Sequence, residues 1–180
     1  MKKTIITILL ALVSLASCSS DPQWADEEAH EKTEQLRKQY TPIIAGTWHV
    51  EYIKDKGRFF ERLTFGADGI FTGMRKWQTR KPVTIDGKEQ HTDWEDVELS
   101  GTFTGTWQLR YWSPEGNSGE KRNCLQLTAT YDDEERDYMA YSCALTFAYA
   151  DATTLRFQGY YVKAPDGWIN YQRGPAEPGF

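Results

Sequence analysis

The sequence has few of the residues on which common catalytic and metal sites depend. It contains three cysteines and three histidines in 180 residues. His30, His49 and His91 lie far apart, and none has the His-x-His or His-x-x-x-His spacing that brings two imidazoles to one metal ion. No glycine-rich phosphate loop is present, and Ser118 in GNSGE lacks the second glycine of a nucleophile elbow. These absences favour a protein that is not an enzyme and that holds neither a cofactor nor a metal.

The sequence also has no excess of positive charge. Lysine and arginine number 21 against 26 aspartates and glutamates, which gives a formal net charge of −5. An acidic chain without a basic stripe repels phosphate backbones. Nucleic acid is therefore excluded as an expected partner.

The most apolar stretch of the chain stands at its beginning. Lys2 and Lys3 precede an apolar run from Ile5 to Leu15, which is shorter than a comfortable membrane span. This pattern is typical of a signal peptide. We expect residues 1–17 to be removed, and losing the two lysines would take the net charge from −5 to −7.

The end of this leader, Leu-Ala-Ser-Cys at residues 15–18, resembles the lipobox of bacterial lipoproteins. The resemblance implies that Cys18 carries fatty acyl chains such as palmitate and holds the protein to a membrane, since each buried methylene contributes about 0.8 kcal/mol. We therefore expect a lipid-anchored protein of the cell envelope, on the periplasmic face of the outer membrane or on the cell surface. The alternative is an ordinary secretory signal with an incidental cysteine.

Residues 18–42 read as a lipidated linker that contains a helix. Asp21 can cap a helix over Pro22–Gln39, acidic residues occupy its early turns, and Pro42 is expected to stop it. The apolar stripe of this helix is thin. We expect it to act as a stalk or to pack lightly against the next domain.

From residue 43 the pattern changes to alternation, which is typical of strands with one buried face. Trp48, Val50 and Tyr52 fall on one side of an extended chain. Turn signals such as GADG at residues 66–69 separate several such strands. The pattern predicts an all-β fold, an antiparallel up-and-down barrel over residues 43–175, with residues 176–180 as a C-terminal tail.

One phrase occurs twice, as AGTWHVEY at residues 45–52 and as TGTWQLRY at residues 104–111. Duplication is one explanation, and the general similarity of neighbouring hairpins is the other. In either case Gly46 and Gly105 are expected to permit close approach of the backbone, and Trp48 and Trp107 to point inward.

The order lipobox, spacer, GTW, LTFGADGIFTG and second GTW resembles the lipocalin-like lipoproteins common in Bacteroidetes, which belong to the wider calycin group. The resemblance implies a barrel whose first strand begins with Gly46 and Trp48. It also implies an arginine near the last strand that stacks on this tryptophan. Arg173 is the positional match and Arg156 the weaker one.

Two functions follow from the predicted barrel. In the first, inward aromatic side chains line a cavity for a small hydrophobic or aromatic ligand. In the second, the same side chains fill the barrel and the protein acts through its surface on an envelope partner. The residues expected to face inward are Trp48, Tyr52, Phe65, Trp107, Tyr111 and Phe157.

With Cys18 lipidated, Cys124 and Cys143 remain. A hairpin that turns near residues 132–135 places them nearly opposite each other, which suits a disulfide. A register that buries the neighbouring apolar residues on one face separates the two sulfurs instead. A disulfide and two buried thiols both remain open.

Overall fold

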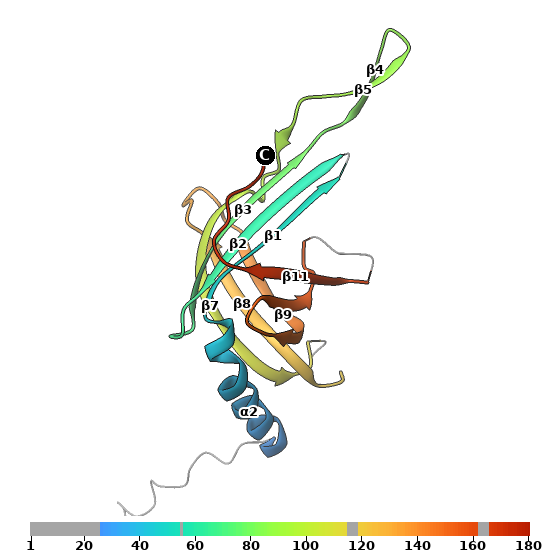
Figure 1. Ribbon diagram of the computed structural model, residues 1–180. Helices are drawn as coiled ribbons and strands as arrows, with labels where there is room; N and C mark the ends of the chain where they lie inside the picture. The colour runs from blue at the N-terminus through green and yellow to red at the C-terminus, as the bar shows by residue number, and fades with distance from the viewer. Residues whose placement is uncertain (1–25, 55, 115–118, 162–165) are drawn as a thin grey trace, which may run out of the picture.

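The structure is a computed structural model that describes residues 26–54, 56–114, 119–161 and 166–180 (Figure 1). The leader, Cys18 and the expected helix start at Pro22 lie outside the described residues. The described elements are α2 (Glu27–Ile44), β1 (Gly46–Lys54), β2 (Gly57–Phe65), β3 (Ile70–Thr79), β4 (Pro82–Ile85), β5 (Lys88–His91), β6 (Glu95–Asp96), β7 (Gly101–Trp112), β8 (Arg122–Tyr131), β9 (Met139–Ala150), β10 (Thr154–Gln158) and β11 (Trp168–Arg173).

Eight of the strands form a closed antiparallel barrel. They pair in the order β1, β2, β3, β7, β8, β9, β10 and β11, and β11 pairs with β1 to close the ring. Each barrel strand therefore lies beside its neighbours along the chain, with the β4–β5 hairpin and short β6 inserted between β3 and β7. The predicted antiparallel barrel preceded by a helix is confirmed.

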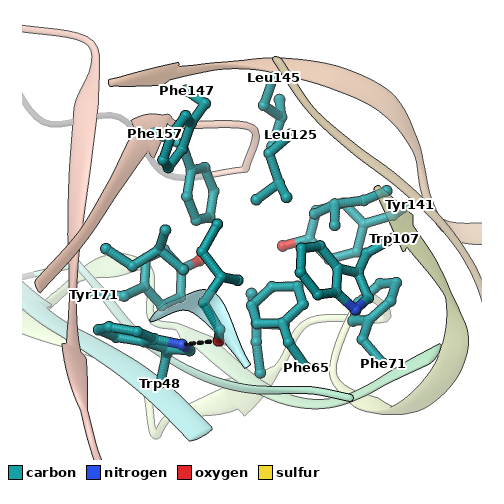
Figure 2. Packing of buried hydrophobic residues seen from close by; sticks show 14 of the residues in the cluster. Trp48, Phe65, Phe71, Trp107, Leu125, Tyr141, Leu145, Phe147, Phe157 and Tyr171 are labelled. Atoms are coloured by element: carbon teal, nitrogen blue, oxygen red, sulfur yellow. Dashed lines mark hydrogen bonds between the residues drawn. The ribbon is translucent and has the colours of Figure 1, made fainter. Parts of the chain in front are cut away.

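The core lies inside the barrel, where alternate residues of each strand meet (Figure 2). Phe65 packs on Phe71 with ring centroids 5.6 Å apart and on Trp107 at 5.1 Å. Phe157 stacks on Tyr171 at 4.9 Å. Aromatic residues thus fill most of this interior, as the high aromatic content of the sequence leads one to expect.

Helix α2 is longer at its end than the sequence suggested. The prediction that Pro42 stops the helix is wrong, because α2 continues through Pro42 to Ile44. Proline forfeits only one helical hydrogen bond there, and the Ala45 N–H still donates to the Thr41 carbonyl at 3.0 Å. The extension buries Ile44 completely in the core. The gain from packing Ile44 outweighs the local cost of the proline.

The same helix covers one end of the barrel and does more than pack lightly. Arg37 Nε donates to the Leu109 carbonyl at 3.1 Å, and the Tyr111 N–H donates to Thr33 Oγ1 at 2.9 Å. Tyr40 packs edge-on against Phe147. Figure 1 shows α2 at one end of the barrel and the β4–β5 hairpin projecting beyond the other.

The tryptophans of the two Gly-Thr-Trp segments both donate a hydrogen bond to a backbone carbonyl, but the segments lie at different places in their strands. Trp48 Nε1 donates to the Ile44 carbonyl at 2.7 Å, and Trp107 Nε1 donates to the Gly66 carbonyl at 2.9 Å. The first phrase begins β1, whereas the second lies in the middle of β7. A Cβ on Gly105 would come within 2.0 Å of the Thr128 carbonyl oxygen, so the neighbouring strand approaches too closely for any side chain.

The tail after β11 lies along the outer face of β1 and β2. The Gly179 N–H donates to Glu51 at 2.8 Å, and Arg62 donates to the Ala176 carbonyl at 3.0 Å. Phe60, which points outward from β2, is only 1% exposed and lies between these contacts. The tail therefore covers an apolar side chain that the barrel alone would leave in water.

We predict that Gly105→Ala destabilises the protein by about 1–3 kcal/mol, because the new methyl group meets backbone that cannot yield. Gly57→Ala is the matched control, since its Cβ would have only an ordinary contact of 3.8 Å and should change stability little. Thermal unfolding followed by circular dichroism measures both. Equal midpoints for the two variants would contradict the close approach at Gly105.

Candidate functional site

The barrel encloses an ion pair that the sequence analysis did not identify. Glu61 of β2 lies directly across from Arg75 of β3, and the two are 0% and 1% exposed. Glu61 shares the inward face of its strand with Leu63 and Phe65. Alternation along β3 likewise turns Arg75 inward. Both charges are therefore placed in the core by the same pattern that places the apolar residues there.

Donors lie beside both oxygens of the Glu61 carboxyl group. Its Oε1 lies 2.8 Å from Arg75 Nε and 2.7 Å from Arg75 Nη2. Its Oε2 accepts hydrogen bonds from the hydroxyls of Tyr141, at 2.8 Å, and Tyr171. The Tyr141 and Tyr171 hydroxyls and Arg75 Nε all donate here, so both carboxyl oxygens act as acceptors. We call Glu61, Arg75, Tyr131, Tyr141 and Tyr171 the interior cluster.

On its other side, Arg75 is held by Tyr131 and by backbone. Nη1 donates to the Tyr131 hydroxyl at 2.9 Å, and that hydroxyl donates to the Leu99 carbonyl at 2.7 Å. The guanidinium carbon also lies 3.8 Å from the ring centroid of Tyr161 and 5.1 Å from that of Phe103. These aromatic faces add cation–π attraction to the ion pair.

One donor in the cluster remains without an acceptor. Arg75 Nη2 lies close to Glu61 Oε1, but the alignment does not make a hydrogen bond, and the buried nitrogen has no other acceptor. Nη2 carries two N–H groups, and Glu61 Oε1, the oxygen paired with it, does not complete a hydrogen bond to it. An unmet buried donor is costly and is normally satisfied by a partner.

Burial and the charge of Glu61 together shift the pKa values of Arg75 and of the tyrosines around it. Burial, reinforced by the Glu61 charge, raises the pKa of Tyr141 and of Tyr171 well above the ordinary value. Burial also raises the pKa of Tyr161 to about 12. Burial alone would lower the pKa of Arg75, but the Glu61 charge and the tyrosines outweigh it, so the net pKa rises. At neutral pH the tyrosines are hydroxyl donors and Arg75 is a cation.

Aromatic side chains that are half-buried or exposed lie at the barrel end that faces away from α2. Trp77 lies 6.4 Å from Tyr161, which contacts Tyr160 at 4.6 Å. Tyr52, near the far end of β1, is half-buried, and Tyr138 packs on Tyr131. We call Tyr52, Trp77, Tyr138, Tyr160 and Tyr161 the aromatic rim. Tyr161 belongs to the rim and also covers one face of Arg75.

The residues expected to line a cavity divide into two groups. Trp48, Phe65, Trp107 and Phe157 do point inward, but each is at most 5% exposed, so protein atoms surround them (Figure 2). The barrel interior near α2 is therefore filled at these positions.

The other two residues lie elsewhere. Tyr52 is half-buried in the aromatic rim. Tyr111 lies near the α2 end of β7, where its ring centroid is 4.5 Å from Lys32 Nζ of α2. Strand β7 still pairs with β8 at this point, and α2 lies beside it.

The arginine expected from the resemblance lies over the first tryptophan. The guanidinium carbon of Arg173 is 4.3 Å from the ring centroid of Trp48, and Arg173 Nη1 donates to the Ala45 carbonyl at 3.3 Å. A Cβ on Gly46 would come within 2.7 Å of the same Arg173 nitrogen. Arg156, the weaker candidate, pairs with Asp166 instead.

Cys124 and Cys143 are free thiols. In the β8–β9 register Cys124 lies across from Thr146 and Cys143 across from Leu127, so the two cysteines are three positions apart. They also point to opposite faces of the sheet. Cys143 packs against the core, whereas Cys124 lies on the other face from Leu125 and Leu127 and contacts the Trp112 carbonyl. Burial raises the pKa of Cys143 to about 12, which makes it a poor nucleophile.

The outer wall carries a row of threonines. Thr47, Thr64, Thr72, Thr104 and Thr130 lie side by side across five consecutive barrel strands. A hollow of ≈ 300 Å³ lies beside this row, lined by Thr64, Thr72 and Thr104 among others. The row forms a continuous band of hydroxyl-bearing residues across these strands.

Across the described residues, no three His, Cys, Asp or Glu side chains gather as a metal site requires. No helix within the described ranges is long and apolar enough to cross a bilayer. Comparisons with protein-family models, curated proteins and solved structures find no match to this chain. Fold and site together define a closed eight-stranded antiparallel barrel with an interior ion pair.

We predict that Glu61→Leu destabilises the protein by about 3–5 kcal/mol, because Arg75 is left as an uncompensated buried charge. The double variant Glu61→Leu/Arg75→Met should recover half of this loss or more. Recovery stays incomplete because the Tyr141 and Tyr171 hydroxyls lack an acceptor. Urea unfolding followed by tryptophan fluorescence gives the free energies. A double variant no more stable than Glu61→Leu would refute the ion pair.

Proposed function

We propose that this chain is a lipid-anchored, lipocalin-like lipoprotein of the cell envelope that binds a small hydrophobic or aromatic ligand in its barrel. The observation that supports it is the interior cluster beneath an aromatic rim. Well-packed apolar residues usually stabilise a core as well as a buried ion pair does, or better. A barrel that served only as a scaffold would gain little from Glu61 and Arg75. Apolar walls with a few convergent polar groups are typical of ligand sites.

The proposal places the ligand at the rim end of the barrel. Near α2 the aromatic side chains already contact one another, whereas Tyr52, Trp77 and Tyr161 remain half-exposed. These three side chains, with Arg75 below them, are the proposed ligand contacts. Trp48, Phe65, Trp107 and Phe157 support this site from beneath.

Helix α2, which follows the proposed anchor in the sequence, and the proposed site lie at opposite ends of the barrel (Figure 1). Helix α2 begins after Asp26, and its last residue, Ile44, is buried at the closed end. A lipid on Cys18 would hold this end toward the membrane, most simply the outer membrane. The aromatic rim would then face away from the bilayer and stay accessible to a ligand.

A second candidate is an envelope lipoprotein that holds no ligand and acts on a protein partner through its surface. The filled interior near α2 and the threonine row on the outer wall favour it. Pull-down from detergent-solubilised envelope, with the threonine row replaced by lysines as control, tests this candidate. A reproducible partner lost in the control would support it.

Cys18→Ser is expected to move the protein from the membrane fraction to the soluble fraction, because the acyl chains supply the membrane affinity. Labelling with an alkyne analogue of palmitate should mark the unchanged chain and leave the variant unmarked. Cys124→Ser is the matched control and should stay labelled. Labelling of Cys18→Ser equal to that of the unchanged chain would exclude this anchor.

The ligand proposal predicts quenching of tryptophan fluorescence by members of a panel of fatty acids, retinoids and bile acids and their neutral derivatives. Trp77→Phe should reduce the quenching strongly because Trp77 lies in the rim. Trp168→Phe, outside the rim, is the matched control. If no compound binds, or if quenching is the same in both variants, the rim is not the ligand site.

A further inference from the structure

We infer that the interior cluster selects an uncharged ligand that carries a hydrogen-bond acceptor oxygen, such as an ester or ketone, and rejects the corresponding carboxylate. This inference rests on the proposed ligand-binding function. It deepens that function by assigning a chemical class to the ligand and a recognition role to Arg75.

The first step is a balance of charge. Among the described residues the buried charged side chains are Glu61 and Arg75, which neutralise each other. A carboxylate ligand placed beside them would bring a second negative charge close to Glu61, with no cation left to match it. Burying an unmatched charge in a core costs far more than burying a neutral polar group. The cluster thus disfavours acids, although it contains an arginine.

The second step is the free donor. Arg75 Nη2 has at least one N–H without an acceptor, and the side chain of Arg75 is 0% exposed. A carbonyl or ether oxygen is an acceptor without charge and can satisfy this N–H. It therefore supplies what the site lacks and leaves the charge balance unchanged.

The third step is access. The Tyr161 ring covers the Arg75 guanidinium, whose carbon lies 3.8 Å from the ring centroid, and Tyr161 itself is half-exposed. Trp77 lies beside Tyr161 and contacts Phe59 edge-on at 5.8 Å. A ligand whose apolar body packs on these rings would bring a polar end past Tyr161 toward Arg75. The aromatic rim would thus bind the apolar part of the ligand, and the interior cluster would bind its polar end.

The test compares three free acids, palmitic, retinoic and cholic acid, with their methyl esters on the full-length protein at neutral pH, where the acids are ionised. Isothermal titration calorimetry gives each affinity. For every scaffold that binds, the ester is expected to bind about tenfold more tightly than the acid or better, since tenfold corresponds to about 1.4 kcal/mol. An acid that binds as tightly as its ester overturns the inference while the proposed function stands. Absence of binding by all six compounds overturns both.

Two variants locate the effect. Glu61→Gln leaves the Arg75 charge unmatched and is expected to reverse the preference toward the acid. Glu51→Gln removes the same charge from the outer face of β1 and should keep the preference for the ester. A preference unchanged in Glu61→Gln contradicts a role for the cluster. The comparison of acid and ester on the unchanged protein decides the inference by itself if Glu61→Gln does not fold.

Discussion

The ion pair between Glu61 and Arg75 is the interaction on which the rest of the interior depends. It joins neighbouring strands, and Arg75 Nη1 and Glu61 Oε2 also bind tyrosines from β8, β9 and β11. The cluster therefore links opposite walls of the barrel by directed bonds, while the surrounding aromatic contacts are mostly non-directional. Separated from any one of these strands, the two charges would lie in an apolar core with unmet hydrogen bonds. Closure of the barrel and burial of the pair stabilise each other.

The two ends of the barrel differ in packing and in exposure to solvent. At one end α2 enters the core with Ile44, and Trp48 bonds to its carbonyl, so helix and first strand are fixed together. At the other end the inward residues stay half-exposed and the polar cluster lies just below them. The end away from α2 is therefore where the proposed ligand would enter, while α2 covers the opposite end (Figure 1).

Much of this arrangement follows from local rules. Alternation in ERLTF turns Glu61 inward with Leu63 and Phe65, and the GADG turn places Phe65 opposite Phe71. Four residues before Phe65 and four residues after Phe71, the next pair but one on the same face consists of Glu61 and Arg75. The alternation of the two strands therefore places Glu61 opposite Arg75 on the inward face. Sequence reasoning does not predict this ion pair, because charged side chains are expected on the protein surface. The tyrosine partners were not predictable, since they come from strands that meet only when the ring closes. The helix continues beyond Pro42 because this buries Ile44 in the core. That burial depends on the folded barrel, so the local sequence around Pro42 does not predict it.

The most direct test of the central claim is the exchange of the Arg75 Nε proton with solvent, measured by nitrogen-15 NMR on the protein labelled at arginine. A buried guanidinium bonded to Glu61 should give an Nε–H signal that persists after transfer to D2O, while the exposed arginines lose theirs quickly. Assignment by Arg75→Lys identifies the signal. Exchange of the Arg75 proton as fast as that of the exposed arginines would contradict the buried ion pair and the account built on it.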